Sequence, residues 1–174
     1  MKKAVTGLVR FIDGLNSILG KAVSWLALLL VCFVSFDVFA RYLFHKSFTI
    51  MQELEWHFFS LLFLLGAGYT LAQNAHVRVD IFYQRLSKKG RALIDLIGCV
   101  VFLFTGVLLV IKTSLPFVQA SWQIHEGSPD PSGIKAWYWL KTVVPVSFVL
   151  LGLQGVSMFF KSLFVLLGLK MEST

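Results

Sequence analysis

Residues 61–80 read LLFLLGAGYTLAQNAHVRVD. The stretch begins as an apolar run and ends in a short polar segment that carries a histidine, an arginine and an aspartate. Extended back to Leu54, the apolar run reaches the roughly 20 residues that an α-helix needs to cross a lipid bilayer. We therefore predict a membrane-spanning helix over 54–73, with the polar segment at one membrane surface.

The composition of the whole chain agrees with lipid as its solvent. Of its 174 residues, 57% are hydrophobic and only 14% are charged, and the mean hydropathy is +0.77. A soluble globular domain has about 25% charged residues. We therefore exclude a soluble globular domain.

Three further segments are long and apolar enough to span a bilayer. They are 22–40, 92–115 and 142–168. With 54–73 they predict an all-α membrane protein, with residues 1–174 forming a single membrane domain of four transmembrane helices.

Two shorter segments have an amphipathic pattern. In 3–21, apolar residues recur at helical spacing, which predicts a helix lying on the membrane surface rather than a cleaved signal peptide. Residues 80–91 predict an interfacial arm helix between spans 2 and 3, with Asp80 as its N-cap and Gly90 near its end. The turn-rich sequence GSPDPSG and nearby tryptophans predict a loop at the membrane boundary over 116–141.

The basic residues predict the orientation. The formal net charge is +7 and the pI is about 9.6, yet the chain has no nucleic-acid-binding signature, so we predict no nucleic-acid partner. Four spans place both termini and the 74–91 connection on one side, which holds eleven Lys and Arg residues against five on the other. By the positive-inside rule both termini are cytoplasmic, and the 116–141 loop is periplasmic.

The middles of the spans are almost devoid of polar residues. Only Gln154 and Thr105 are polar there, and no residue is ionisable. Transporters and pumps place polar or ionisable groups near the bilayer midplane, where the cargo binds. A single copy of this chain therefore offers no evident ion or substrate route.

Polar residues gather instead at the outer ends of the first two spans. Asp37 and Arg41 have the i, i+4 spacing of an ion pair, and Glu53, Glu55 and His57 open the second span. Two interpretations remain open for this cluster: solvation at the interface, or a polar patch that contacts another subunit.

Cofactor and catalytic signatures are missing from the sequence. A membrane haem usually needs two histidines on facing helices at one depth, and His57 is the only histidine within a span. Cys32 and Cys99 are interpreted as small buried hydrophobic residues. We therefore predict no cofactor, no metal site and no enzymatic activity.

Several stretches together resemble the small, DctQ-type membrane subunit of tripartite ATP-independent periplasmic (TRAP) transporters. They are RYLF (41–44), ELEW (53–56), GAGYTLAQNAHVRVD (66–80) and WYWLKTVVPVSFVLLGLQG (137–155). The 66–80 stretch, with its Gly-rich helix end and following turn, is the most specific of them.

The resemblance implies a role in a bacterial inner-membrane transporter. In that family a periplasmic binding protein delivers a substrate, often an organic acid. A large membrane subunit carries it with sodium ions, and the small subunit packs against and steadies the scaffold of the large one. The expected partners are the large transport subunit, as a separate polypeptide, the periplasmic substrate-binding protein and membrane lipids.

Candidate partner-interface residues come from the outer polar cluster, the small residues of span 2 and the turn after it. They are Asp37, Arg41, Glu53, Glu55, Gly66, Gly68, Tyr69, His76, Arg78 and Asp80. We expect the NAHVRVD turn to set the angle of the arm helix, with Arg78 reaching a lipid phosphate or a partner carboxylate. A locally capped turn without partner contact is the alternative interpretation.

Two other functions stay open at this stage. The chain is either a membrane-anchor subunit of a respiratory enzyme, which a haem absorbance band would indicate, or an autonomous small transporter or channel, which would move solute without a partner. The sequence does not specify the substrate.

Overall fold

The computed structural model describes residues 2–45, 47–73, 83 and 85–169, and within these ranges every regular element is helical. The elements are α1 (Lys2–Phe44), α2 (Thr49–Ala72), α4 (Lys88–Gly98), the π-helix η1 (Cys99–Phe104), α5 (Thr105–Gln123) and α6 (Trp137–Leu166). Helices α4, η1 and α5 follow one another without a break. Four helical stretches are long and apolar enough to cross a membrane, which confirms the predicted all-α fold with four spans.

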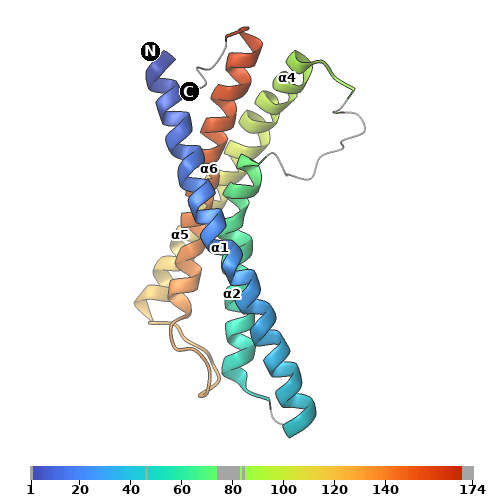
Figure 1. Ribbon diagram of the computed structural model, residues 1–174. Helices are drawn as coiled ribbons and strands as arrows, with labels where there is room; N and C mark the ends of the chain where they lie inside the picture. Colours follow the sequence, from blue (N-terminus) through green and yellow to red (C-terminus); the bar gives the residue numbers. More distant parts are fainter. Residues whose placement is uncertain (1, 46, 74–82, 84, 170–174) are drawn as a thin grey trace.

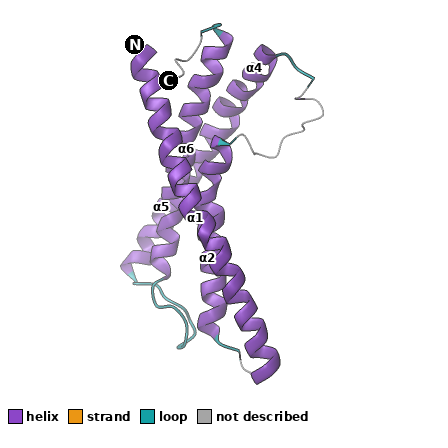
Figure 2. Ribbon diagram, viewed as in Figure 1, coloured by secondary structure: helices purple, strands orange, loops and turns teal. Residues whose placement is uncertain are grey.

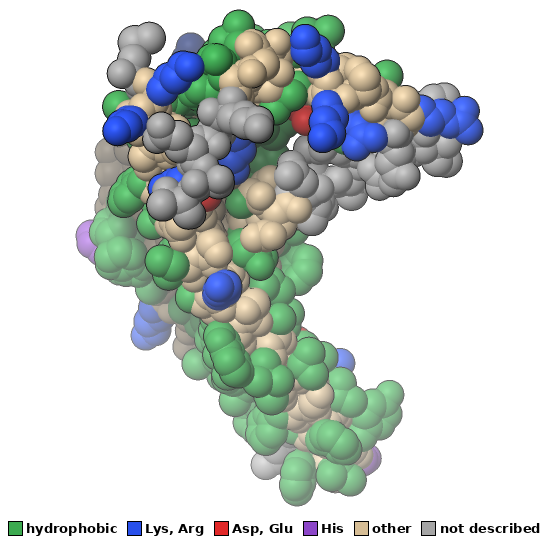
Figure 3. All heavy atoms as spheres, turned by 45° about the horizontal axis from the view of Figure 1, so that its top comes forward, with side chains coloured by type: hydrophobic (Ala, Val, Ile, Leu, Met, Phe, Trp, Pro, Cys, Tyr) green, Lys and Arg blue, Asp and Glu red, His purple; other side chains and the backbone are tan. Residues whose placement is uncertain are grey.

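The helices form an elongated bundle with its connections at two ends (Figures 1 and 2). At one end α1 begins, α4 begins and α6 ends, and Lys and Arg side chains gather there (Figure 3). We call it the basic end. The other end holds the turn between α1 and α2 and the loop 124–136, and we call it the loop end.

Helix α6 is the centre of the bundle, since it packs against α1, α2, α4, η1 and α5. Helices α1 and α2 pack against each other, with the Phe33 and Phe58 rings 5.3 Å apart. The π-helix meets α6 closely. The Cys99 thiol donates to the Gly155 carbonyl at 3.2 Å, and a Cβ on Gly155 would lie 2.4 Å from Leu103.

The interior is as polar as it is apolar. Among the described residues other than glycine and proline, ten buried residues are hydrophobic and ten are polar or charged. Large apolar side chains instead point outward: Phe63 is 71% exposed and Phe102 is 76% exposed. This distribution suits a bundle in lipid, where apolar side chains gain nothing from facing inward.

The N-terminal segment differs from its prediction. Residues 3–21 are helical, but they continue without a break into the first span as one helix, α1. The face carrying Val9, Ile12 and Asn16 is buried, because it packs against α6 and α2. The amphipathic pattern therefore reflects contact with α2 and α6.

The loop predicted over 116–141 is shorter, covering 124–136. Helix α5 runs through Pro116 to Gln123, and α6 already begins at Trp137. A helix in lipid tends to continue past a proline because its backbone groups have no water to bond to.

Of the predicted arm helix 80–91, residues 80–82 and 84 lie outside the described residues. Its last residues belong to a different helix: Ser87 caps α4 by accepting a hydrogen bond from the Gly90 amide at 3.2 Å. Gly90 therefore lies in the first turn of α4 rather than near the end of an arm.

Candidate functional site: two polar junctions

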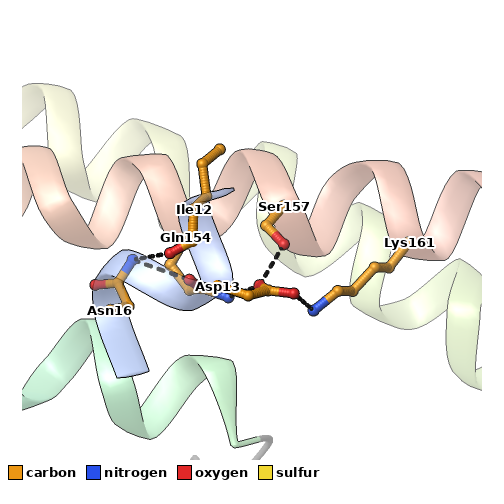
Figure 4. Close-up of polar contacts among 6 residues, drawn as sticks. All are labelled: Ile12, Asp13, Asn16, Gln154, Ser157 and Lys161. Atoms are coloured by element: carbon orange, nitrogen blue, oxygen red, sulfur yellow. Dashed lines mark hydrogen bonds and ion pairs between the residues drawn. The ribbon is translucent and has the colours of Figure 1, made fainter. Parts of the chain in front are cut away.

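A cluster of polar side chains joins α1 to α6 within the bundle (Figure 4). The Asp13 carboxylate on α1 accepts hydrogen bonds from Gln154 Nε2 at 2.8 Å and from Ser157 Oγ at 2.7 Å. Its second oxygen pairs with Lys161 Nζ at 2.6 Å. One carboxylate therefore binds three successive polar residues of one face of α6.

Asn16 completes the cluster one turn farther along α1. Its side-chain amide donates to Gln154 Oε1 at 2.9 Å and to the Ile12 carbonyl at 3.2 Å. Gln154 is 1% exposed and Ser157 is fully buried. We call Asp13, Asn16, Gln154, Ser157 and Lys161 the Asp13 network.

The Asp13 network is suited to holding helices together. A buried polar group is costly in an apolar surrounding unless it is hydrogen-bonded, and here amide, hydroxyl and ammonium donors converge on one carboxylate. These contacts fix α1 against α6.

The sequence interpretation missed this network. The sequence pattern predicts only a surface helix over 3–21, and it gives Gln154 as one of two polar residues in mid-span. A signal was present, because Gln154, Ser157 and Lys161 recur every three to four residues on one helical face, as do Asp13 and Asn16 on the other helix.

A second junction lies at the loop end, centred on Glu53 of α2. This carboxylate is 6% exposed and accepts hydrogen bonds from the Ile134 amide at 2.6 Å, from Trp137 Nε1 at 3.4 Å and from the Ser128 hydroxyl. Three donors around the end of the loop therefore converge on one side chain of α2. We call Glu53, Ser128, Ile134 and Trp137 the Glu53 junction.

Neighbouring contacts strengthen the Glu53 junction. Thr49 Oγ1 donates to Asp130 Oδ2 at 3.2 Å, and the Trp56 and Trp137 rings meet edge to face at 5.4 Å. A Cβ on Gly133 would lie 2.6 Å from Glu53 Oε1, so only glycine leaves room for the carboxylate. The Ser132 hydroxyl and amide donate to Asp130 and lower the pKa of its carboxyl.

The predicted ion pair between Asp37 and Arg41 is present. Asp37 is 2% exposed, while the Arg41 side chain is 53% exposed. Asp37 Oδ1, Glu55 Oε1 and His57 Nε2 are buried and have no hydrogen-bond partner among the described residues. His57 Nδ1 lies 2.6 Å from the Glu53 carbonyl oxygen.

The small residues of span 2 divide between two uses. A Cβ on Gly68 would lie 2.3 Å from Asn16 Oδ1, and Tyr69 lies against Gly20 of α1, so both positions serve contacts within the chain. A Cβ on Gly66 would meet nothing within 4 Å, which leaves this face open. The candidates His76, Arg78 and Asp80 lie outside the described residues.

No cluster of three or more His, Cys, Asp or Glu side chains able to hold a metal ion is found in the described part of the chain. Half of the ten buried polar residues lie in the Asp13 network, in the Glu53 junction or at Asp37.

The comparison with protein families finds one match. A sequence model described as the DctQ component of tripartite ATP-independent periplasmic transporters matches residues 30–165. No curated protein matches the chain. The matched region includes the whole Glu53 junction and the α6 side of the Asp13 network, whereas Asp13 and Asn16 precede it.

Proposed function

The chain belongs to the DctQ family, the small membrane component of TRAP transporters, and from this premise we propose that it packs against the large transport subunit and stabilises its scaffold. In this proposal the large subunit carries an organic acid together with sodium ions, and a periplasmic binding protein delivers the acid. The small subunit supplies fixed structure and binds no cargo.

One observation carries the proposal: the two most extensive polar clusters described in the bundle join parts of this chain to one another. The Asp13 network and the Glu53 junction each converge on a carboxylate whose donors come from this chain. Cargo needs polar groups that face a pathway. A bundle with internally bonded polar groups and an apolar exterior is suited to bracing another membrane protein.

The proposed orientation places both termini in the cytoplasm of a bacterium, with the chain in the inner membrane. Its support is the excess of Lys and Arg at the basic end, where α1 begins and α6 ends (Figure 3). The loop 124–136, held by Glu53, then lies on the periplasmic side, where a binding protein arrives.

The proposed contact surface keeps the candidates that have an exposed side chain, open space around them, or a buried oxygen without a partner among the described residues. Arg41 and Gly66 face outward, and Asp37 and Glu55 each present a buried oxygen with no partner among the described residues. The turn residues His76, Arg78 and Asp80 remain candidates from the sequence. Glu53, Gly68 and Tyr69 make contacts inside the bundle, so we rank them as the least favoured candidates for the contact surface.

Reconstitution tests the function. Vesicles that contain this chain with the large subunit and the binding protein should take up substrate in a sodium gradient, and vesicles with this chain alone should show no flux. Deleting the chain should lower the yield and activity of the large subunit. Flux through the chain alone, or a fully active large subunit after its deletion, would contradict the proposal.

A variant pair tests the contact surface. The double substitution Arg78→Ala and Asp80→Ala should weaken copurification of the large subunit, whereas Lys89→Ala, which removes a neighbouring exposed charge, should not. Equal complex yield and transport in both variants would reject a role for the turn.

A further inference from the structure

A cavity of about 280 Å³ opens at the basic end between α2, α4 and α6. Helix α4 packs against α6, and in Figure 1 it leans away from the other helices at this end. The lining comes from Leu71 and Ala72 of α2, from the first two turns of α4, and from α6 between Gln154 and Val165.

The charged groups of the lining favour an anion. Lys88 and Arg91 of α4 and Lys161 of α6 face the cavity, against one acidic residue, Asp95. Asp95 already accepts a hydrogen bond from the Tyr83 hydroxyl at 2.6 Å. The Lys161 ammonium forms an ion pair with Asp13, so the net positive charge of the lining comes from α4.

Two of the three positive groups, Arg91 and Lys161, are held in place. Arg91 Nε donates to the Leu86 carbonyl at 3.0 Å, and its guanidinium lies 5.7 Å from the centre of the Tyr83 ring. Lys88 begins α4, and within the described residues no acidic side chain forms an ion pair with it. The amino end of α4 adds its partial positive charge on the same side.

The rest of the lining is apolar. Leu71, Ala92, Met158 and Val165 form this wall, and along α4 the next apolar side chains, Leu93, Ile94 and Ile97, are about half exposed on its outer surface. A free phosphate ion would use only the cations. A molecule with a phosphate at one end and hydrocarbon at the other would use both parts of the lining.

We propose that this cavity is a binding site for one anionic phospholipid, with its phosphate between Lys88, Arg91 and Lys161 and its glycerol and upper acyl chains along the apolar wall. Basic pockets between membrane helices bind lipid headgroups in this way. The lipid fills the gap between α4 and the rest of the bundle, and links α4 to α6. The site is independent of the proposed contact with the large subunit.

Lys88 and Lys89 provide a matched pair for the test. Both are exposed lysines in the first turn of α4, but only Lys88 lines the cavity. The full chain is purified in mild detergent with phosphatidylglycerol, with phosphatidylcholine or with inorganic phosphate. Retained lipid is counted by native mass spectrometry, and thermal unfolding is followed by circular dichroism.

We expect one phosphatidylglycerol to be retained per chain and to raise the unfolding temperature, with phosphatidylcholine retained less. Lys88→Gln should weaken phosphatidylglycerol binding about fivefold, the effect of one basic residue at a lipid surface, and Lys89→Gln should leave it nearly unchanged. Arg91→Lys, which keeps the charge, should bind more tightly than Arg91→Gln.

Equal lipid retention by the Lys88→Gln and Lys89→Gln variants would overturn the proposal, because the attraction would then be a diffuse surface effect. Stabilisation by inorganic phosphate that depends on Lys88, without retention of phosphatidylglycerol, would also overturn it and identify a free anion as the ligand. Both results are independent of transport activity, so they differ from a failure of the proposed function.

Discussion

The two ends of the bundle use a carboxylate in different ways. At the basic end, Asp13 joins two helices through side chains alone, and its side chain is 31% exposed. At the loop end, Glu53 is 6% exposed and binds the backbone of a loop as well as two side chains. One junction links preformed helices, whereas the other defines the path of a segment that has no regular structure.

This difference predicts that breaking the two junctions lowers the free energy of unfolding by different amounts. Helices in lipid keep their own backbone hydrogen bonds, so loss of the Asp13 network leaves α1 and α6 intact. The loop 124–136 has only separate backbone hydrogen bonds, such as those from the Ser128 amide to the Ile134 carbonyl and from the Trp137 amide to the Glu126 carbonyl, so its position depends more strongly on Glu53. We therefore expect the Glu53 junction to be the more sensitive of the two.

The largest effect should come from Glu53→Ala, which breaks the loop-end junction. It leaves the part-buried Ile134 amide and Ser128 hydroxyl without their acceptor, and should lower the free energy of unfolding by about 3 kcal/mol. Limited proteolysis should then cut within 124–136, as seen by mass spectrometry. Lys135→Arg, which alters an exposed side chain of the same loop, is the control, and an uncut loop in Glu53→Ala would refute the assignment.

Gly68→Ala should have the next largest effect, because the added methyl group on α2 would clash with the Asp13 network. The new Cβ would lie 2.3 Å from Asn16 Oδ1, and Asn16 is held by Gln154. We expect a loss of about 2 kcal/mol from overpacking. Gly66→Ala, two residues away with open space around it, should instead be neutral or slightly stabilising; equal unfolding temperatures for the two variants would contradict this packing.

Asp13→Ala should cost less than Glu53→Ala, and this ordering is the direct test of the comparison. The substitution leaves Gln154 Nε2 and the Ser157 hydroxyl without their acceptor, but Gln154 keeps its bond with Asn16, and a serine in a helix can donate to the carbonyl one turn earlier. Lys161 is 39% exposed and can turn toward water or a lipid phosphate, so we expect a loss of about 1.5 kcal/mol. Thermal unfolding of both variants in one detergent measures the order. A larger loss of stability in Asp13→Ala than in Glu53→Ala would contradict the expectation that the Glu53 junction is the more sensitive of the two.

The coupling between Asn16 and Gln154 should be smaller still. A double-mutant cycle with Asn16→Ala and Gln154→Ala isolates their hydrogen bond, and side-chain hydrogen bonds between membrane helices are worth about 0.6 kcal/mol. Additive effects of the two substitutions would show that the amides stabilise the bundle separately.

The smallest effect should be a pH dependence at the loop end. The hydrogen bond from Lys141 holds the pKa of Glu126 below its ordinary value of 4.5. A lowered pKa means that the contribution is present above the unfolded value and is lost as the pH falls through the folded one. Proteolysis of the loop should therefore speed up slightly in acid, and Lys141→Gln should remove that dependence; the same acid response in Lys141→Gln would exclude this pair as its origin.

The fold was largely predictable because hydropathy constrains a membrane chain so strongly. A bilayer requires long apolar helices with all backbone groups bonded, and 54–73 and 92–115 carry that pattern plainly. Element ends were less predictable. The span predicted to end at residue 115 continues through Pro116 to Gln123, because the environment outweighs local propensity there.

The two junctions were harder to predict, because each depends on residues that are far apart in the sequence. Glu53 was recognised as notable, but only the structure shows that it faces Ile134 rather than a partner. Asp13 and Gln154 are 141 residues apart, and neither the spacing within α1 nor that within α6 names the other helix. Periodicity shows which face of a helix carries the polar residues, but it does not show which helix or loop packs against that face.

The sequence by itself determined that this is a four-span helical membrane protein of the DctQ type, because the bilayer's thickness and its lack of water leave an apolar chain few alternatives. Only the tertiary structure decided how its few polar residues are used. Hydrogen bonds act over about 3 Å, so the use of a polar side chain depends on which helix or loop lies next to it.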